Sequence, residues 1–229
     1  MSRVEMLRDR HRGKRCVIVA NGPSLNRMQL DRLRREHVIG LNKIFLGLSR
    51  FGFYPQYHVT VNPKVTVQSR EEIQALNCVK FISRHAARAA GIAEDALTHL
   101  LETDPPPARF STDLALGIHE GWTVTYAALQ VAYYLGFSQV VLIGLDHRYA
   151  FVGEPNEDRL MDGPDPNHFS DKYFGFGQRW DNPDLAKSEE SYGIALQTFQ
   201  ADGRSIVDAT LEGACPVFPR VSYDAILPP

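Results

Sequence analysis

The chain has 229 residues and a formal net charge of -2, with 44% hydrophobic and 23% charged residues. This composition is ordinary for a soluble globular protein, and the charge balance argues against a nucleic-acid-binding surface. No apolar run reaches membrane-spanning length and no secretory signal pattern opens the chain, so we expect one cytoplasmic domain over residues 1–229.

Three widely spaced cysteines, Cys16, Cys78 and Cys215, fit a reducing compartment and show no zinc-binding spacing. A basic run from Arg8 to Arg15 leaves a weak contact with a membrane surface open. A homo-oligomer is likewise left open by the sequence.

The first predicted element is a buried parallel strand at residues 16–20, where the apolar run Cys-Val-Ile-Val-Ala is continuous. It ends on the turn-forming cluster Asn21-Gly22-Pro23-Ser24, and a helical pattern follows from about Arg27. A strand, tight loop and helix in this order offer backbone N–H groups to a phosphate, and Ser24 is expected to cap the helix or donate to that phosphate. The loop matches neither the dinucleotide nor the P-loop fingerprint, and a plain βα turn is the structural alternative.

Further strands and helices alternate along the chain. Apolar runs predict strands at 38–42, 57–62, 79–82, 140–144 and 205–209. Helical periodicity predicts helices at 124–136, with Thr123 as N-cap, and from 185 to 199. Residues 84–120 show no regular pattern and include three prolines at 105–107. Residues 148–183 are rich in Pro, Gly, Asp and aromatic residues and are interpreted as a lid.

This alternation predicts an α/β fold, a Rossmann-like, doubly wound and mostly parallel sheet with a lid-like insertion. Ligands bind such sheets at the carboxyl ends of the strands. Four predicted strands end on Asn21, Asn42, Asn62 and Asp146, which should therefore meet on one rim. Amide side chains suit ribose hydroxyls and base edges, although Asn also favours turns for purely structural reasons. Taken together, these residues predict a nucleotide site.

Several motifs resemble those of known enzymes. Residues 21–25, Gly-Leu-Asn at 40–42 and Val-Asn-Pro at 61–63 look like the nucleotide-binding half of bacterial lipooligosaccharide sialyltransferases. Residues 123–136 and 144–146 resemble the central helix and strand of these enzymes, and Asn-His-Phe at 167–169 resembles the segment that carries their catalytic histidine. The similarity runs in order over most of the chain, with identity concentrated in these motifs.

The pattern also resembles a wider bacterial and archaeal family of uncertain function. Its members include 6-hydroxymethyl-7,8-dihydropterin diphosphokinases and domains of flagellin-modifying glycosyltransferases. Residues 120–126 and 218–221 look closest to this wider family. Membership does not by itself fix the reaction.

The resemblance to the sialyltransferases assigns expected roles. The loop Asn21-Gly22-Pro23-Ser24 would hold the phosphate and ribose of a cytidine nucleotide, and Asn42 and Asn62 would contact the ribose and the donor. Residues expected at the donor sugar and its rim are Thr123, Thr125 and Asp146. Tyr149 would hydrogen-bond the leaving phosphate and His168 would be the general base; no metal or other cofactor is needed.

The expected function is therefore a transferase, and more specifically a glycosyltransferase in surface-glycan assembly. It would use a CMP-sugar donor and a glycan or small-molecule acceptor, with His168 as a base because imidazole titrates near neutrality. One departure concerns the donor. The segment that grips it in the sialyltransferases carries Arg and Ser-Gly, whereas here Glu120 opens that segment, so sialic acid is put in doubt.

Two other functions remain open from the sequence. A 6-hydroxymethyl-7,8-dihydropterin diphosphokinase would transfer diphosphate from ATP with magnesium, and Asp146 would then be a metal ligand. A non-catalytic nucleotide-binding domain is the third reading. The structural alternative for His168 itself is a histidine that holds an ordered loop in place.

Overall fold

A computed structural model describes residues 4–104, 109–150 and 153–228; the predicted proline break at 105–107 lies outside them. The described chain contains a seven-stranded sheet, ordered β11-β8-β1-β2-β3-β4-β5, in which every pairing is parallel. Its strands are β1 (Arg15–Val19), β2 (His37–Leu41), β3 (Tyr57–Thr60), β4 (Val79–Ser83), β5 (Thr98–Leu101), β8 (Gln139–Ile143) and β11 (Ser205–Asp208). The predicted Rossmann-like, doubly wound α/β fold is confirmed.

The strands are apolar throughout because both faces of the sheet are covered. In β1, Cys16 and Ile18 pack into one core cluster, whereas Val17 and Val19 pack into a second cluster on the other face. All four side chains are inaccessible to solvent. The continuous apolar run that predicted a buried parallel strand has this two-sided burial as its physical cause.

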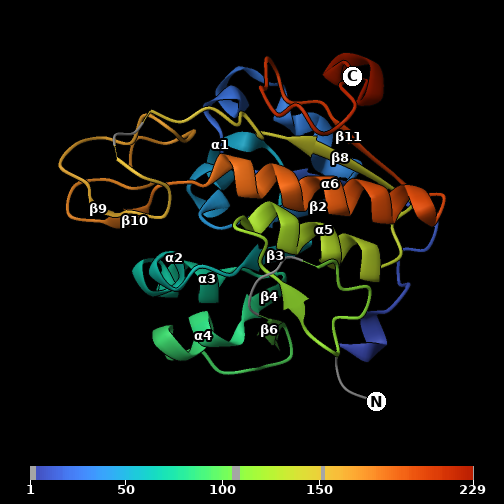
Figure 1. The fold of residues 1–229 in the computed structure, drawn as a ribbon, viewed down its shortest axis with the longest axis horizontal. Coiled ribbons are helices and arrows are strands. Elements are labelled where there is room, and N and C mark those ends of the chain that lie inside the picture. The colour runs from blue at the N-terminus through green and yellow to red at the C-terminus, as the bar shows by residue number, and fades with distance from the viewer. Residues whose placement is uncertain (1–3, 105–108, 151–152, 229) are drawn as a thin grey trace.

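Helices α5 (Val124–Tyr134) and α6 (Leu185–Ala201) lie side by side across one face of the sheet (Figure 1). Thr123 caps α5, as predicted, by accepting a hydrogen bond from the backbone N–H of Thr125. The shorter α-helices are α1 (Leu48–Phe51), α2 (Pro63–Gln68), α3 (Arg70–Ala75), α4 (Arg84–Ala90) and α7 (Tyr223–Ile226).

The other face carries short 3-10 helices where the sequence predicted an ordinary helix from about Arg27. They are η2 (Pro23–Arg27) and η3 (Leu30–Arg35), with η1 (Glu5–Leu7) and η4 (Ile44–Gly47) elsewhere. The buried leucines of η3 are three residues apart, Leu30 and Leu33, which matches the three-residue turn of a 3-10 helix. Ser24 caps no helix; the expectation of a cap was wrong, because its hydroxyl contacts Asp146 instead.

Residues 84–120 are more regular than their sequence indicated. They contain α4, strand β5 and the two-residue strands β6 (Thr103–Asp104) and β7 (Ile118–His119), which pair in parallel. These elements are too short to show a repeating apolar pattern, and β5 is an edge strand of the sheet. Helix α4 packs against α2 and β4, β5 pairs with β4, and β7 packs against α5, so these elements depend on tertiary contacts rather than on local periodicity.

The 148–183 segment projects at one end of the molecule as the antiparallel hairpin β9 (Asp158–Leu160) and β10 (Arg179–Asp181) (Figure 1). It also contributes to the core on the face of η2 and η3. Its buried contributors are Phe169, Tyr173, Phe174 and Trp180. The segment is therefore anchored to the sheet by apolar side chains.

The basic start of the chain is paired within the molecule: Arg8, Arg12 and Arg15 form ion pairs with Asp113, Asp9 and Glu36. The three cysteines are free and buried. In the described parts of the chain, no helix combines the length and apolar character required to cross a membrane.

We expect the stability to depend on pH through His58 in β3, which is fully buried and donates from Nε2 to the carbonyl of Asn42 at 2.6 Å. Burial lowers its pKa from 6.5 to about 4. The neutral form is favoured in the folded state, so its stabilising contribution is present above pH 6.5 and is lost as the pH falls towards 4. Between pH 7 and 5 the loss should be about 2 kcal/mol.

Urea unfolding of the wild type and of His58→Gln at both pH values measures this contribution. The stability difference between the two proteins should shrink by about 2 kcal/mol at pH 5. An equal change in the free energy of unfolding between pH 7 and pH 5 in the two proteins would contradict this role of His58.

Candidate functional site

The carboxyl ends of β1, β2, β3 and β8 meet at one rim, where two adjoining cavities open. The larger is a cleft of about 640 Å³, and the smaller cavity holds about 80 Å³. The larger cleft has the volume of a typical small-molecule site, whereas the smaller could hold only part of a nucleotide. Asn42, Thr123, Tyr149 and His168 line both cavities and mark where they join.

Most of the sequence-predicted site residues lie at this rim. Those bordering only the smaller cavity are Asn21, Gly22, Thr125 and Asp146, and Asn62 borders only the larger cleft. Pro23 and Ser24 line neither cavity as it stands. The convergence expected from the strand ends is therefore observed for nearly all of these side chains.

The loop after β1 holds a carboxylate of the protein itself. Ser24 donates from its backbone N–H and its hydroxyl to the two carboxylate oxygens of Asp146, at 3.0 and 2.7 Å. The N–H of Gly22 donates to the carbonyl of Gly144. Burial raises the pKa of the Asp146 carboxyl, and the two bonds from Ser24 oppose that rise. In this conformation Asp146 takes the donors of Ser24 that were expected to hold a phosphate.

The three asparagines at the rim have different local roles. Asn62 caps α2 by accepting from the N–H groups of Lys64 and Val65. Asn42 has a φ of 45°, a left-handed conformation that Asn tolerates better than most residues. Asn21 donates from its amide to the carbonyl of Leu41, and its Oδ1 is buried without a hydrogen-bond partner among the described residues.

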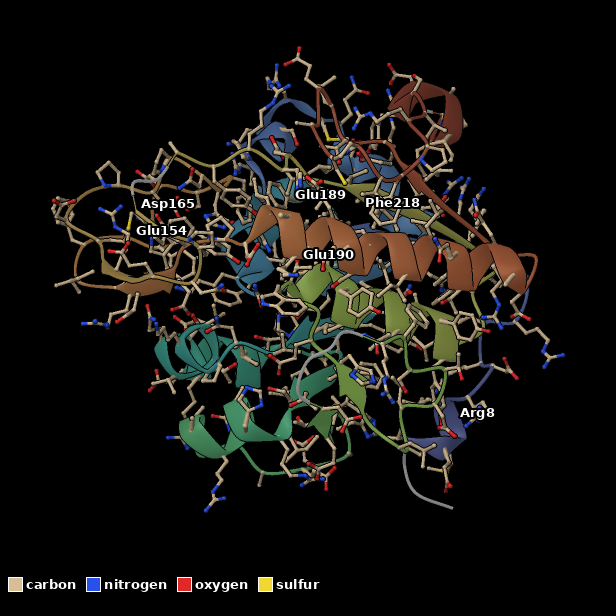
Figure 2. All side chains as sticks on the ribbon, viewed as in Figure 1. Arg8, Glu154, Asp165, Glu189, Glu190 and Phe218 are labelled. Carbon is tan, nitrogen blue, oxygen red and sulfur yellow. The ribbon has the colours of Figure 1, made fainter. Side chains whose placement is uncertain are left out.

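His168 is oriented by a buried carboxylate. Its Nδ1 lies 2.7 Å from Oδ2 of Asp165, which also accepts from the backbone N–H of Phe174. An ionised carboxylate can only accept, so Nδ1 carries the proton and Nε2 keeps a lone pair. Asp165 is 5% exposed and lies in the projecting segment, on the side of the N-terminal end of α6 (Figure 2). This is the arrangement of an oriented general base.

Aromatic rings hold the imidazole of His168 in place. It stacks on Tyr173 with 3.8 Å between ring centroids and 1° between planes, and it meets Phe174, Trp180 and Tyr149 edge-on. Burial raises the pKa of Tyr149 to about 12, so its hydroxyl is neutral at physiological pH and available as a donor. His168 and Tyr149 both line the junction between the cavities.

The start of α5 forms another part of the rim. Thr123 Oγ1 lies 3.2 Å from the hydroxyl of Tyr192 in α6. This contact joins α5 to α6 directly beside the smaller cavity. The Thr123 hydroxyl is therefore partnered within the protein, and both Thr123 and Thr125 border the smaller cavity.

The far wall of the larger cleft carries a weakly ionised group. Burial raises the pKa of Glu120 to about 7, and His85 Nε2 lies 3.4 Å from its Oε1. His119 lines the same wall. Within the described residues, no three His, Cys, Asp or Glu side chains are grouped so as to hold a metal ion.

The sequence analysis named no residue that orients His168 and gave Lys43 no role. The spacing Asp165-x-x-His168 was the available signal for this pair, because side chains three residues apart can meet across a turn. The contacts of Lys43 are with residues about 130 positions away, and no local pattern indicates them.

Gly22 should tolerate no side chain, because a Cβ there would lie 1.8 Å from Asp146 Oδ2 and 2.7 Å from the carbonyl of Gly144. We expect Gly22→Ala to lower the free energy of unfolding by about 1–3 kcal/mol through overpacking. Gly193→Ala in α6 is the matched control: its Cβ meets nothing within 4 Å, and alanine should stabilise the helix by about 1 kcal/mol. Thermal unfolding compares the two, and an unchanged midpoint for Gly22→Ala would contradict this account of the loop.

The MAf glycosyltransferase from Magnetospirillum magneticum AMB-1 has a similar fold, with a TM-score of 0.58 and 15% identity over 97% of this chain. The chain spans only 37% of that protein's length. The sialyltransferase CstII from Campylobacter jejuni, solved with cytidine-5'-monophosphate, gives a TM-score of 0.52 and 12% identity over 92% of this chain and 86% of its own.

At these identities the solved structures establish the shared fold alone. No curated protein matches the chain. The profile of one family matches residues 2–151, about two thirds of the sequence. The chain belongs to the 6-hydroxymethylpterin diphosphokinase MptE-like family.

Proposed function

We propose that this protein is a glycosyltransferase that uses a nucleotide-activated sugar, with His168 as the general base. The observation that carries the proposal is the Asp165–His168 pair at the junction of the two cavities. A base held by a carboxylate and facing a cleft of substrate size is what deprotonation of an acceptor hydroxyl requires. The similar fold of two glycosyltransferases supports it.

The proposed reaction divides its steps between the residues at the junction. Nε2 of His168 takes the proton from the acceptor hydroxyl as its oxygen bonds to the anomeric carbon. The bond from that carbon to the nucleotide phosphate breaks, and the neutral hydroxyl of Tyr149 donates to the departing phosphate. The unpartnered Oδ1 of Asn21 would accept from a ribose hydroxyl at the smaller cavity.

The nucleotide is expected to contain cytidine, because CstII, whose fold is similar, was solved with cytidine-5'-monophosphate. Sialic acid is not part of the proposal. Among the described residues that line the larger cleft, Lys64 is the one lysine or arginine, and its Nζ is paired at 2.5 Å with both Asp158 and Asp181. A sugar carboxylate would meet no unpaired cation there.

Diphosphate transfer from ATP is the second candidate, favoured by the description of the family. It would need magnesium, for which Asp146 was the expected ligand. Both oxygens of that carboxylate accept hydrogen bonds from Ser24, and among the described residues no three His, Cys, Asp or Glu side chains are grouped to hold a metal ion with it. We therefore derive no step through a metal at Asp146.

A panel of CMP, CDP, UDP, GDP, ADP and ATP, each with and without magnesium, tests the choice by thermal shift. A nucleotide at one hundred times its Kd should stabilise the protein by about 2.7 kcal/mol. Stabilisation by CMP without magnesium supports the glycosyltransferase, and stabilisation by ATP only with magnesium favours the diphosphokinase. Binding without turnover of any donor would leave a non-catalytic nucleotide-binding domain.

His168→Gln and Asp165→Asn should each reduce turnover of the donor found in this way by about 10²–10⁴-fold while nucleotide binding is retained. His147→Asn is the matched control: His147 also pairs with a carboxylate, Glu189 at 2.9 Å, but lines neither cavity. Asn suits its left-handed φ of 55°. Equal turnover by His168→Gln and the wild type would refute the role of His168.

The charge argument has its own test. CMP-N-acetylneuraminate should stabilise the protein no more than CMP does, because the larger cleft offers its carboxylate no unpaired cation. Thermal shift at matched concentrations compares the two. Additional stabilisation by the sialyl group would overturn the exclusion of sialic acid and leave the rest of the proposal standing.

A further inference from the structure

A buried lysine lies beneath the histidine site. Lys43 directly follows Asn42 at the end of β2, and its side chain is 2% exposed. Its Nζ donates to the carbonyl of Tyr173 and to Oε1 of Gln178, both at 2.6 Å. The lysine therefore ties the end of a central strand to the projecting 148–183 segment, about 130 residues further along the chain.

Lys43 binds the same residue on which the imidazole of His168 stacks, Tyr173. Tyr173 is the ring stacked on the imidazole, 3.8 Å away and parallel to within 1°. Lys43 Nζ also lies 4.6 Å from the ring centroid of Phe174, another neighbour of that imidazole. A displacement of Lys43 would thus move both Tyr173, on which the imidazole stacks, and Phe174, which meets it edge-on.

Both direct partners of Lys43 are uncharged, although its ammonium group is buried. Burial lowers its pKa to about 8, while the charges of Asp165 and of Glu72 in α3 act in the opposite direction. An apolar side chain would fill the same space without the desolvation cost of an ammonium group. Packing alone does not account for a lysine here, whereas its reach to Tyr173 and Gln178 and its attraction to Asp165 do.

We propose that Lys43 is a positioning residue for His168: it holds the backbone of Tyr173, whose ring stacks on the imidazole. In this arrangement the imidazole keeps the contact of its Nδ1 with Asp165, at the junction of the cavities that His168 lines. The catalytic meaning of this geometry rests on the proposed function, but the geometry itself is measurable in the free protein.

The test uses NMR of the unliganded protein. Ring stacking moves the imidazole proton resonances of His168 upfield, and imidazole nitrogen shifts report which nitrogen carries the proton; His168→Gln assigns the signals. In Lys43→Met we expect the proton resonances to move towards those of free histidine and the fraction protonated at Nδ1 to fall. Lys43→Arg, which keeps the charge and the donors, should restore part of both signals.

Lys80→Met is the matched control, because Lys80 is also a buried lysine and donates to two backbone carbonyls, those of Leu76 and Cys78. It can lower stability in the same way, but it should leave the His168 signals unchanged. Unchanged His168 signals in folded Lys43→Met would overturn the proposal, as would an equal change in Lys80→Met.

Should Lys43→Met not fold, Gln178→Ala removes one of the two acceptors and should still displace the His168 signals; their constancy in that variant overturns the proposal. Once a donor is known, Lys43→Met should reduce kcat by about 10–100-fold at an unchanged donor KM, since a 1 Å misplacement costs about 100-fold. Changed NMR signals without any turnover in the wild type would refute the proposed function and leave the positioning role intact.

Discussion

The contact between Ser24 and the carboxylate of Asp146 is the constraint on which the rim of the sheet depends. It joins the loops that follow β1 and β8, two neighbouring central strands, through bonds of 3.0 and 2.7 Å. Only glycine fits at position 22, since any Cβ there would overlap that carboxylate. Because the loops after β1 and β8 are held together, Asn21 from the first and Tyr149 from the second border the same small cavity.

The projecting 148–183 segment supplies His168 and its carboxylate partner Asp165. It returns to the core through Phe169, Tyr173 and Trp180, and this packing brings Asp165 and His168 to the junction of the cavities. The buried aromatic residues of the segment pack against the sheet, and its hairpin borders the larger cleft through Trp180 and Asp181. An aromatic surrounding suits a base, because it restricts the rotation of the imidazole without competing for its hydrogen bonds.

Charge distinguishes the two cavities. Arg148 borders the smaller one together with Asp146, whereas the larger cleft is lined by Asp181, Glu120 and a lysine that is already paired. Burial raises the pKa of Glu120 to about 7, so this wall is only partly charged near neutrality. The chain thus belongs to a family described by diphosphate transfer and shares its fold with two glycosyltransferases.

The sequence by itself determined the central strands, α5 with its Thr123 cap, and the convergence of Asn21, Asn42 and Asp146, because apolar runs and strand-end positions are local signals. It did not determine the 3-10 helices or β5 and α4, which are short and depend on tertiary packing. Only the tertiary structure decided that Asp146 accepts a hydrogen bond from Ser24, that Asp165 orients His168 and that Lys43 donates to the carbonyl of Tyr173. The contacts of Ser24 and Lys43 join residues more than one hundred positions apart. In all three contacts a buried polar group is paired with a partner that the folded chain brings within hydrogen-bond distance, and neither composition nor periodicity encodes that proximity.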